Sequence, residues 1–194
     1  MAQRARTGKE RREAAEARRA RRAAVTDPAV AMEAAATFLA VRSRSVEETR
    51  RRLNQLGYPS SLCDQVVDKL VTLRYLDDDE FARAWVESRD RAKPRGAVAL
   101  RRELQLKGVP DDTIAAVLEE RERHSRQQAA HDEAPLDADR TAALKLVARR
   151  QNALLREADP RRRRQKAYAL LARNGFPPDV CHEVAATVTN DDPE

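Results

Sequence analysis

The chain has 194 residues, of which 36% are charged and 41% hydrophobic, and its formal net charge is +6. Only 4% of the residues are aromatic, which favours several small cores of Leu, Val and Ala over one large core. No apolar run approaches the roughly 20 residues that span a bilayer, and the basic N-terminus lacks the apolar segment of a signal peptide. We therefore expect a cytoplasmic protein that does not cross a membrane.

The first 28 residues carry nine basic and four acidic side chains, a net charge of +5, whereas the rest of the chain carries +1. No large apolar residue lies between Met1 and Val25, so this segment cannot bury enough surface to offset the entropy lost on ordering. We expect residues 1–28 to form a basic tail that is disordered or partly helical. Asp27 and Pro28 are typical of a helix N-terminus, and the folded part is predicted to begin there.

One seven-residue pattern occurs three times: LNQLGYP from residue 53, LQLKGVP from residue 104 and LARNGFP from residue 171. A Gly after an apolar helical segment predicts a helix C-cap, because Gly enters the left-handed region without a Cβ penalty. The next apolar residue is expected to fold back onto the helix, and the Pro to stop it from continuing. Polar residues at 60–61, 111–112 and 179 are candidates for the N-cap of another helix. Each pattern therefore predicts a sharp turn between two helices.

Apolar residues at helical spacing place further helices around these turns. The predicted first helices cover 29–42, 78–92 and 138–155, the middle helices cover 45–56, 96–107 and 159–174, and a third helix follows each Gly. Ser45 and Glu48 form a capping box at the start of one middle helix. Counted from each Gly, Cys63, Ile114 and Cys181 occupy the same position. Both Cys are therefore expected to be small core residues and not nucleophiles.

These elements predict an all-α fold of three tandem three-helix modules, forming an elongated, curved right- or left-handed array with a basic N-terminal extension. The predicted boundaries are 29–76 for module 1, 77–123 for module 2 and 137–190 for module 3, with a polar linker at 124–136. A single module of this size has little core of its own. Stacked modules would support one another and present a long face to a partner.

The stretch from Tyr75 to Pro110 resembles the signature of the RecX family. The matching pieces are Leu76-Asp77-Asp78, Phe81-Ala82, Trp85-Val86, Arg89, Gly96, Leu100, Glu103-Leu104 and Lys107-Gly108-Val109. The repeat arrangement extends the resemblance over residues 29–190 and leaves the basic tail outside it. The resemblance implies an all-helical bacterial regulator that binds the RecA filament on DNA. It further implies negative modulation of the recombinase, ATPase and co-protease activities of RecA, and hence regulation of DNA repair and the SOS response.

The predicted middle helices are basic, whereas the third helices lean acidic. If the modules stack in register, the basic side chains would form a positive stripe suited to phosphates or to an acidic protein groove. We expect a monomer whose partners are the RecA filament and DNA, single- or double-stranded and bound without sequence specificity. The candidate partner-binding residues are Arg50, Arg51, Lys93, Arg95, Arg101, Arg102, Lys107, Arg162, Arg163 and Lys166.

The charged, aromatic, His and Cys residues also have simpler structural interpretations. Any one of the charges is more often part of a solvated helix face. Phe81 and Trp85 are four residues apart, which favours core packing over a base-stacking platform. The three His and two Cys form no cluster at ligand or catalytic spacing, so we expect no enzyme, no metal and no cofactor. The alternative function is a helical repeat protein that acts on duplex DNA independently of RecA, and a weaker one is a helical adaptor for another partner.

Overall fold

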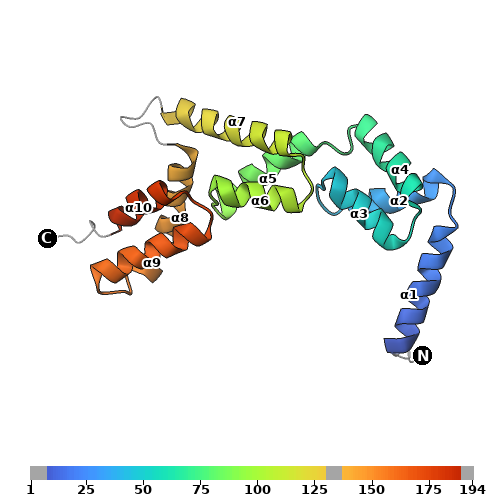
Figure 1. Cartoon of the computed structure of the whole chain (residues 1–194), viewed down its shortest axis with the longest axis horizontal. Helices are drawn as coiled ribbons and strands as arrows, with labels where there is room; N and C mark the ends of the chain where they lie inside the picture. The colour runs from blue at the N-terminus through green and yellow to red at the C-terminus, as the bar shows by residue number, and fades with distance from the viewer. Residues whose placement is uncertain (1–7, 130–136, 189–194) are drawn as a thin grey trace. The chain divides into compact units, whose positions relative to one another are not determined.

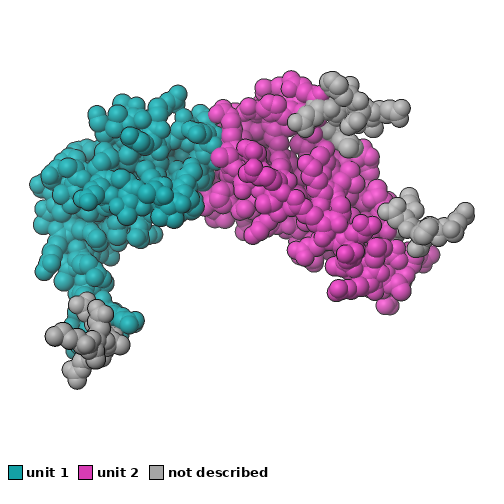
Figure 2. Space-filling model, turned by 180° about the vertical axis from the view of Figure 1, so that it is seen from behind, with its two compact units in different colours: residues 1–81 teal, residues 82–194 magenta. Residues whose placement is uncertain are grey.

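The structure is a computed structural model that describes residues 8–129 and 137–188 (Figure 1). Within these residues every regular element is an α-helix, and the chain divides into two compact units, residues 1–81 and 82–194 (Figure 2). The helices are α1 (Gly8–Ala23), α2 (Pro28–Leu39), α3 (Val46–Leu56), α4 (Ser60–Thr72), α5 (Asp78–Ala92), α6 (Ala97–Leu106), α7 (Asp111–Ala129), α8 (Ala138–Leu154), α9 (Pro160–Arg173) and α10 (Pro178–Thr187). None of the described helices is long and apolar enough to cross a membrane.

The helices after α1 group in threes, which confirms the predicted all-α fold of three-helix modules. Module 1 consists of α2, α3 and α4 in the first unit, and module 3 consists of α8, α9 and α10 in the second unit. Module 2 consists of α5, α6 and α7, and the boundary between the units falls inside α5. Of the predicted linker at 124–136, the residues up to Ala129 belong to α7, and the others lie outside the described residues.

The three Gly-containing patterns close their helices in one geometry. The Gly of each has a positive φ, which is 100° at Gly57, 76° at Gly108 and 78° at Gly175. The N–H of the following residue donates to a carbonyl five residues earlier, at 3.3 Å for Tyr58, 3.2 Å for Val109 and 3.4 Å for Phe176. All three of these following side chains are buried. The predicted C-cap and fold-back turn are therefore confirmed in every module.

The predicted N-caps after these turns are wrong in modules 1 and 3. Pro59 and Pro177 occupy the N-cap positions of α4 and α10, and no side chain caps either helix there. Ser60 is instead the first residue of α4, and Asp179 lies in the first turn of α10. The turn is so short that the next helix begins directly after the Pro, whose fixed φ suits the extended backbone of an N-cap.

The repeated position six residues after each Gly lies in the core. Cys63, Ile114 and Cys181 all have 0% of their surface exposed, which confirms the prediction of small core residues. Both thiols are free, and burial raises their pKa. A raised pKa leaves less of the reactive thiolate at neutral pH, as is typical of structural Cys.

Ser45 begins α3 with the predicted capping box. Its hydroxyl oxygen accepts from the Glu48 N–H at 3.1 Å, and the Glu48 carboxylate accepts from the Ser45 N–H at 3.4 Å. Because Ser45 is completely buried, no water replaces the lost bond in Ser45→Ala. We expect that variant to lower the free energy of unfolding by about 1 kcal/mol in urea unfolding followed by circular dichroism. The matched control is Ser60→Ala, at an exposed position in the first turn of α4, with an expected change below about 0.5 kcal/mol. Equal losses in the two variants would contradict the cap.

The predicted basic tail is helical from Gly8 to Ala23, and residues 1–7 lie outside the described residues. α1 contacts module 1 near its own C-terminus. Arg22 donates to the carbonyl oxygen of Leu56 at 3.5 Å and lies 5.8 Å from the ring centroid of Tyr58. Arg19 packs so closely on Gly57 that a Cβ there would lie 2.5 Å from its side chain. The rest of α1 extends away from module 1 (Figure 1).

Candidate partner-binding surface

The candidate residues of the first unit, Arg50 and Arg51 in α3, are held by carboxylates of module 1. Glu47 lies 3.1 Å from Arg50 and 2.8 Å from Arg51, and Asp64 of α4 lies 2.9 Å from Arg50. The hydrogen bond with Asp64, and then that with Glu47, raises the pKa of Arg50. Burial opposes the charge of Glu47, but the bonds from Arg50 and Arg51 outweigh it and lower its pKa. The two pairs of Glu47 therefore stabilise module 1 at neutral pH, and their contribution is lost as the pH falls through the lowered pKa of Glu47.

In the second unit, α6 has one buried side and one exposed side. Leu100 and Leu104 are completely buried, whereas Val98 is 65% and Leu106 is 70% exposed. The exposed residues share one side of the helix, and we call them the α6 face: Val98, Arg101, Arg102, Gln105 and Leu106. Arg101 and Arg102 make no ion pair within the described part of the chain. The α6 face therefore combines two uncompensated guanidinium groups with two large apolar side chains.

Lys107, at the end of α6, is engaged with residues of module 2. Glu103 accepts hydrogen bonds from Nε1 of Trp85 at 2.8 Å and from Nε of Arg89 at 2.6 Å. Arg89 and Lys107 lie over the Trp85 ring, 4.3 Å and 4.6 Å from its centroid. Phe81 is 3% exposed and belongs to the core, as predicted. Trp85 is only half-buried. The ammonium of Lys107 therefore helps to hold the indole ring in place.

The candidate residues of α9 differ in exposure. Arg162 and Lys166 are exposed, and they lie near Asp159 and Glu157 respectively. Arg163, in contrast, is 5% exposed, and its Nε donates to the carbonyl oxygen of Glu157 at 3.1 Å. A buried guanidinium offers a partner almost no surface, so Arg163 does not fit the predicted role of a partner contact.

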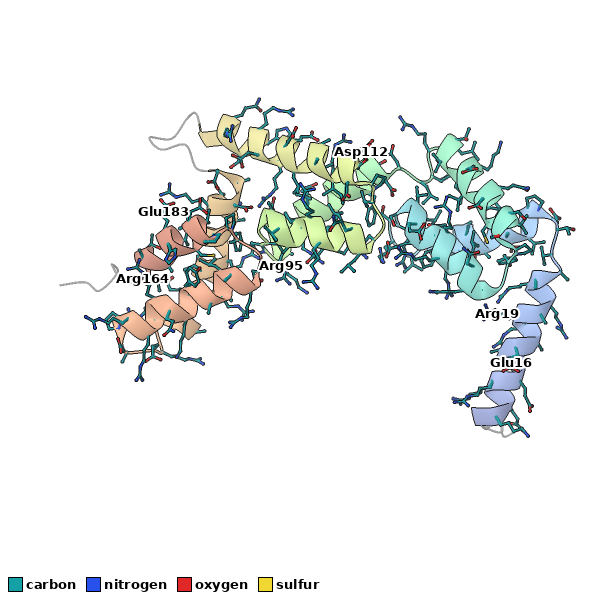
Figure 3. All side chains as sticks on the ribbon, in the orientation of Figure 1. Glu16, Arg19, Arg95, Asp112, Arg164 and Glu183 are labelled. Carbon is teal, nitrogen blue, oxygen red and sulfur yellow. The ribbon has the colours of Figure 1, made fainter. Side chains whose placement is uncertain are left out.

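The basic residues of α6 and α9 do not form one patch. The start of α6 lies against the end of α9, where the Gly96 N–H donates to the carbonyl oxygen of Asn174 at 3.0 Å and Arg95 donates to the Asn174 side chain. Lys93 is exposed next to this junction. Arg162 and Lys166 belong to the N-terminal half of α9, the part of the helix in which Figure 3 labels Arg164.

The junction between modules 2 and 3 centres on Arg121 of α7, which the sequence analysis did not single out. Its side chain is 8% exposed and pairs with Asp90 of α5 at 2.8 Å and with Asp139 of α8 at 2.7 Å. It also donates to the carbonyl oxygens of Arg95 at 3.4 Å and Ala138 at 3.2 Å. Burial opposes the charge of Arg121, but the two carboxylates outweigh burial and raise its pKa. Arg121 thus connects helices of both modules.

A sequence signal for Arg121 did exist. It follows Ile114 by seven residues and Val117 by four, so it continues the buried side of α7 by one more turn. A charged residue in such a register indicates either the end of the core or a buried ion pair.

At the junction between modules 2 and 3, the backbone at the start of α6 also lies in close contact with the turn that follows α9. A Cβ on Gly96 would lie 2.1 Å from the carbonyl oxygen of Gly175, and a Cβ on Gly175 would lie 2.5 Å from the Cβ of Ala99. The Ala97 N–H donates to both carboxylate oxygens of Asp139 at 3.0 Å. α6 and α9 can therefore approach this closely only because both contact positions are Gly.

The side chains of the α6 face are suited to binding a partner. Arg is among the residue types enriched at the energetic centres of protein–protein interfaces, and exposed Val98 and Leu106 offer apolar surface that a partner could bury. Among the described residues, no group of His, Cys, Asp and Glu is arranged to hold a metal ion. A separate hollow between α5, α7 and α8 is lined by Val86, Val117 and Ala142, and no candidate residue lines it.

Comparisons with known proteins agree with the module boundaries seen in the structure. Models of the first, second and third three-helix domains of RecX match residues 31–70, 77–118 and 137–184. The chain is 34% identical to regulatory protein RecX of Prosthecochloris aestuarii over 151 residues, which cover 78% of this chain and 88% of that protein. It is 33% identical to regulatory protein RecX of Bacillus velezensis over 148 residues, which cover 75% of this chain but only 50% of that protein.

Solved structures share the fold. The crystal structure of RecX from Lactobacillus salivarius gives a TM-score of 0.65 at 17% identity, over 83% of this chain and 96% of that one. A second crystal structure of a regulatory protein RecX gives 0.65 at 19% identity, over 96% of this chain and 81% of that one. Three matched domains in order, together with 34% identity over most of the chain, show that this chain belongs to the RecX family.

Proposed function

We propose that the chain binds the RecA filament on DNA in the cytoplasm and lowers the recombinase, ATPase and co-protease activities of RecA. DNA repair and the SOS response would be regulated in consequence. Membership of the RecX family supports this role. The observation that carries the proposal in this chain is the α6 face, which combines exposed Val98 and Leu106 with Arg101 and Arg102, two side chains that have no ion-pair partner among the residues the structure describes.

The composition of the α6 face fits a protein partner better than nucleic acid alone. Burial of apolar surface contributes about 25 cal/mol per Å², and Val98 and Leu106 would lose that gain against a phosphate backbone. Two guanidinium groups beside them suit carboxylates on the partner, because Arg pairs with a carboxylate through two parallel hydrogen bonds. The expected contact is therefore an apolar, acidic patch on RecA.

A contact of this kind would act on the filament through neighbouring subunits. A chain that touches more than one RecA subunit would restrain their relative motion, and so would hamper filament growth or the motions that accompany ATP turnover. The restraint depends on contacts at the α6 face and requires no chemistry by the regulator. Inhibition is therefore expected to follow binding.

The α6 face can be tested by charge reversal and by removal of its apolar groups. We expect Arg101→Glu/Arg102→Glu and Val98→Ser/Leu106→Ser each to weaken binding to RecA filaments at least about tenfold, because charge reversal opposes an acidic partner, removal of two apolar side chains forfeits the apolar area they would bury, and about 1.4 kcal/mol corresponds to tenfold. Lys107 is left in place because it lies over Trp85. Binding is measured by light scattering or surface immobilisation with filaments preformed on single-stranded DNA.

The matched control is Arg123→Glu/Arg150→Glu, two exposed Arg of the same unit outside the α6 face. It makes the same change in net charge and is expected to bind within about twofold of the natural chain. Unchanged binding by both α6 variants would contradict a RecA contact at this face. An effect on duplex DNA that needs no RecA would favour the alternative of an independent DNA-binding protein.

A further inference from the structure

α1 separates its charges by side. Helical geometry, at about 100° per residue, places six arginines within about half of the helix circumference. We call them the α1 Arg face: Arg11, Arg12, Arg18, Arg19, Arg21 and Arg22. The three acidic residues of the helix, Glu10, Glu13 and Glu16, lie on the other half. The helix is therefore polarised across its axis and not merely basic on average.

Most of the α1 Arg face is uncompensated. Arg11, Arg12, Arg18 and Arg21 are exposed and make no ion pair within the described part of the chain. The carboxylate of Glu13 lies 3.9 Å from Lys9, on its own side of the helix. Four neighbouring guanidinium groups without counter-charges produce a positive potential that an anionic partner would relieve.

The other two arginines hold α1 on module 1. Arg22 donates to the carbonyl oxygen of Leu56, in the last turn of α3, where a helix dipole favours positive charge. Arg19 packs against Gly57, and Figure 3 shows it beside the end of α3 with Glu16 farther along α1. The α1 Arg face is therefore presented on an anchored helix, which reduces the ordering entropy lost when a partner binds.

The side chains of α1 also indicate the kind of partner. From Gly8 to Ala23 the helix contains no apolar residue larger than Ala, so it lacks the apolar anchors that protein interfaces use. Phosphate groups require only cationic donors, and Arg binds them with two hydrogen bonds at once. From Arg11 to Arg22 the helix rises roughly 16 Å, a length along which one strand of duplex DNA presents about five phosphates.

We propose that the α1 Arg face binds the phosphate backbone of duplex DNA. This contact is separate from the α6 face and from RecA, and it lies outside the matched RecX domains, which begin at residue 31. It gives the chain a DNA affinity of its own that is sensitive to salt and indifferent to sequence.

The test compares two triple variants of the full chain by fluorescence anisotropy on a labelled mixed-sequence duplex, without RecA. The first is Arg11→Ala/Arg18→Ala/Arg21→Ala, in which Ala preserves the helix. The control is Arg123→Ala/Arg150→Ala/Arg156→Ala, which removes the same charge from exposed residues of the second unit. Circular dichroism verifies that both variants keep their helix content.

We expect the α1 variant to bind at least about tenfold more weakly, and its log–log salt slope to fall in magnitude by about 2 to 3 between roughly 50 and 200 mM salt. The control is expected to bind within about twofold of the natural chain. Equal losses in the two variants would show an effect of net charge alone and overturn the proposal. Unchanged affinity of the α1 variant would also overturn it. Because the DNA assay contains no RecA, its result is independent of the proposed function.

Discussion

Gly96→Ala is expected to lower the free energy of unfolding of the second unit by about 3 kcal/mol, since over-packing of a close contact commonly costs 1–3 kcal/mol and sometimes more. The new Cβ would lie 2.1 Å from the backbone carbonyl oxygen of Gly175, which cannot turn aside as a flexible side chain could. To relieve this clash, α6 must move away from α9. That movement lengthens the hydrogen bond from the Gly96 N–H to the carbonyl oxygen of Asn174. Urea unfolding followed by far-ultraviolet circular dichroism measures the loss.

Two other Gly→Ala variants serve as comparisons for the stability loss of Gly96→Ala. Gly8→Ala meets no atom within 4 Å and is expected to change the free energy of unfolding by less than about 0.5 kcal/mol. Gly175→Ala combines a crowded Cβ with a φ of 78°, so it adds a left-handed backbone penalty of about 1–2 kcal/mol to the clash. The expected order of destabilisation is Gly175→Ala, then Gly96→Ala, then Gly8→Ala. A Gly96→Ala chain as stable as the natural one would contradict the close contact of α6 with α9.

Arg121→Met is the second large effect, with an expected loss of about 3–5 kcal/mol in the free energy of unfolding, as is usual when one partner of a buried ion pair is removed. The Arg121 side chain is 8% exposed, and its loss leaves the carboxylates of Asp90 and Asp139 without their cation. Met fills a similar volume, so the loss reports charge and hydrogen bonding more than a cavity. The measurement is again urea unfolding.

The control for charge at the surface is Arg126→Met in the same helix. Arg126 is exposed and pairs with Glu122 one turn away, so its removal is expected to cost less than about 0.5 kcal/mol. Addition of Asp90→Asn and Asp139→Asn to Arg121→Met should recover part of the loss, because neutral amides no longer need a cation. If Arg121→Met and Arg126→Met cost the same, the buried network does not hold modules 2 and 3 together.

The elements within each module were predictable from the sequence because their causes are local. A Gly four residues after a Leu, followed by an apolar residue and Pro, predicts the same turn wherever it occurs, and Gly57, Gly108 and Gly175 all adopt it. The equivalent positions of Cys63 and Cys181 likewise predicted burial without any knowledge of the tertiary fold. The N-caps of α4 and α10 were predicted wrongly because polar residues after the Pro look like caps even when the Pro itself occupies that position.

Contacts between modules were not predictable in this way. Arg121, Asp90 and Asp139 come from three helices and lie together only after modules 2 and 3 pack. Arg163 falls in a run of four arginines, and only its register with Ala167 and Leu171, four and eight residues later, distinguishes the buried one from its exposed neighbours. Composition indicated that the middle helices are basic, whereas exposure depends on how each helix is rotated in its module. The α6 face therefore emerged only from the structure.

The measurement that most directly tests the proposed function is the single-strand-DNA-dependent ATPase rate of RecA as this chain is added at fixed salt. We expect the rate to fall at amounts of the chain below those of RecA, because one regulator that restrains a filament affects many subunits. The Arg101→Glu/Arg102→Glu chain should require at least about tenfold more protein for the same inhibition. The control Arg123→Glu/Arg150→Glu should match the natural chain. An ATPase rate unaffected by an excess of the natural chain would contradict the account, whatever its affinity for DNA.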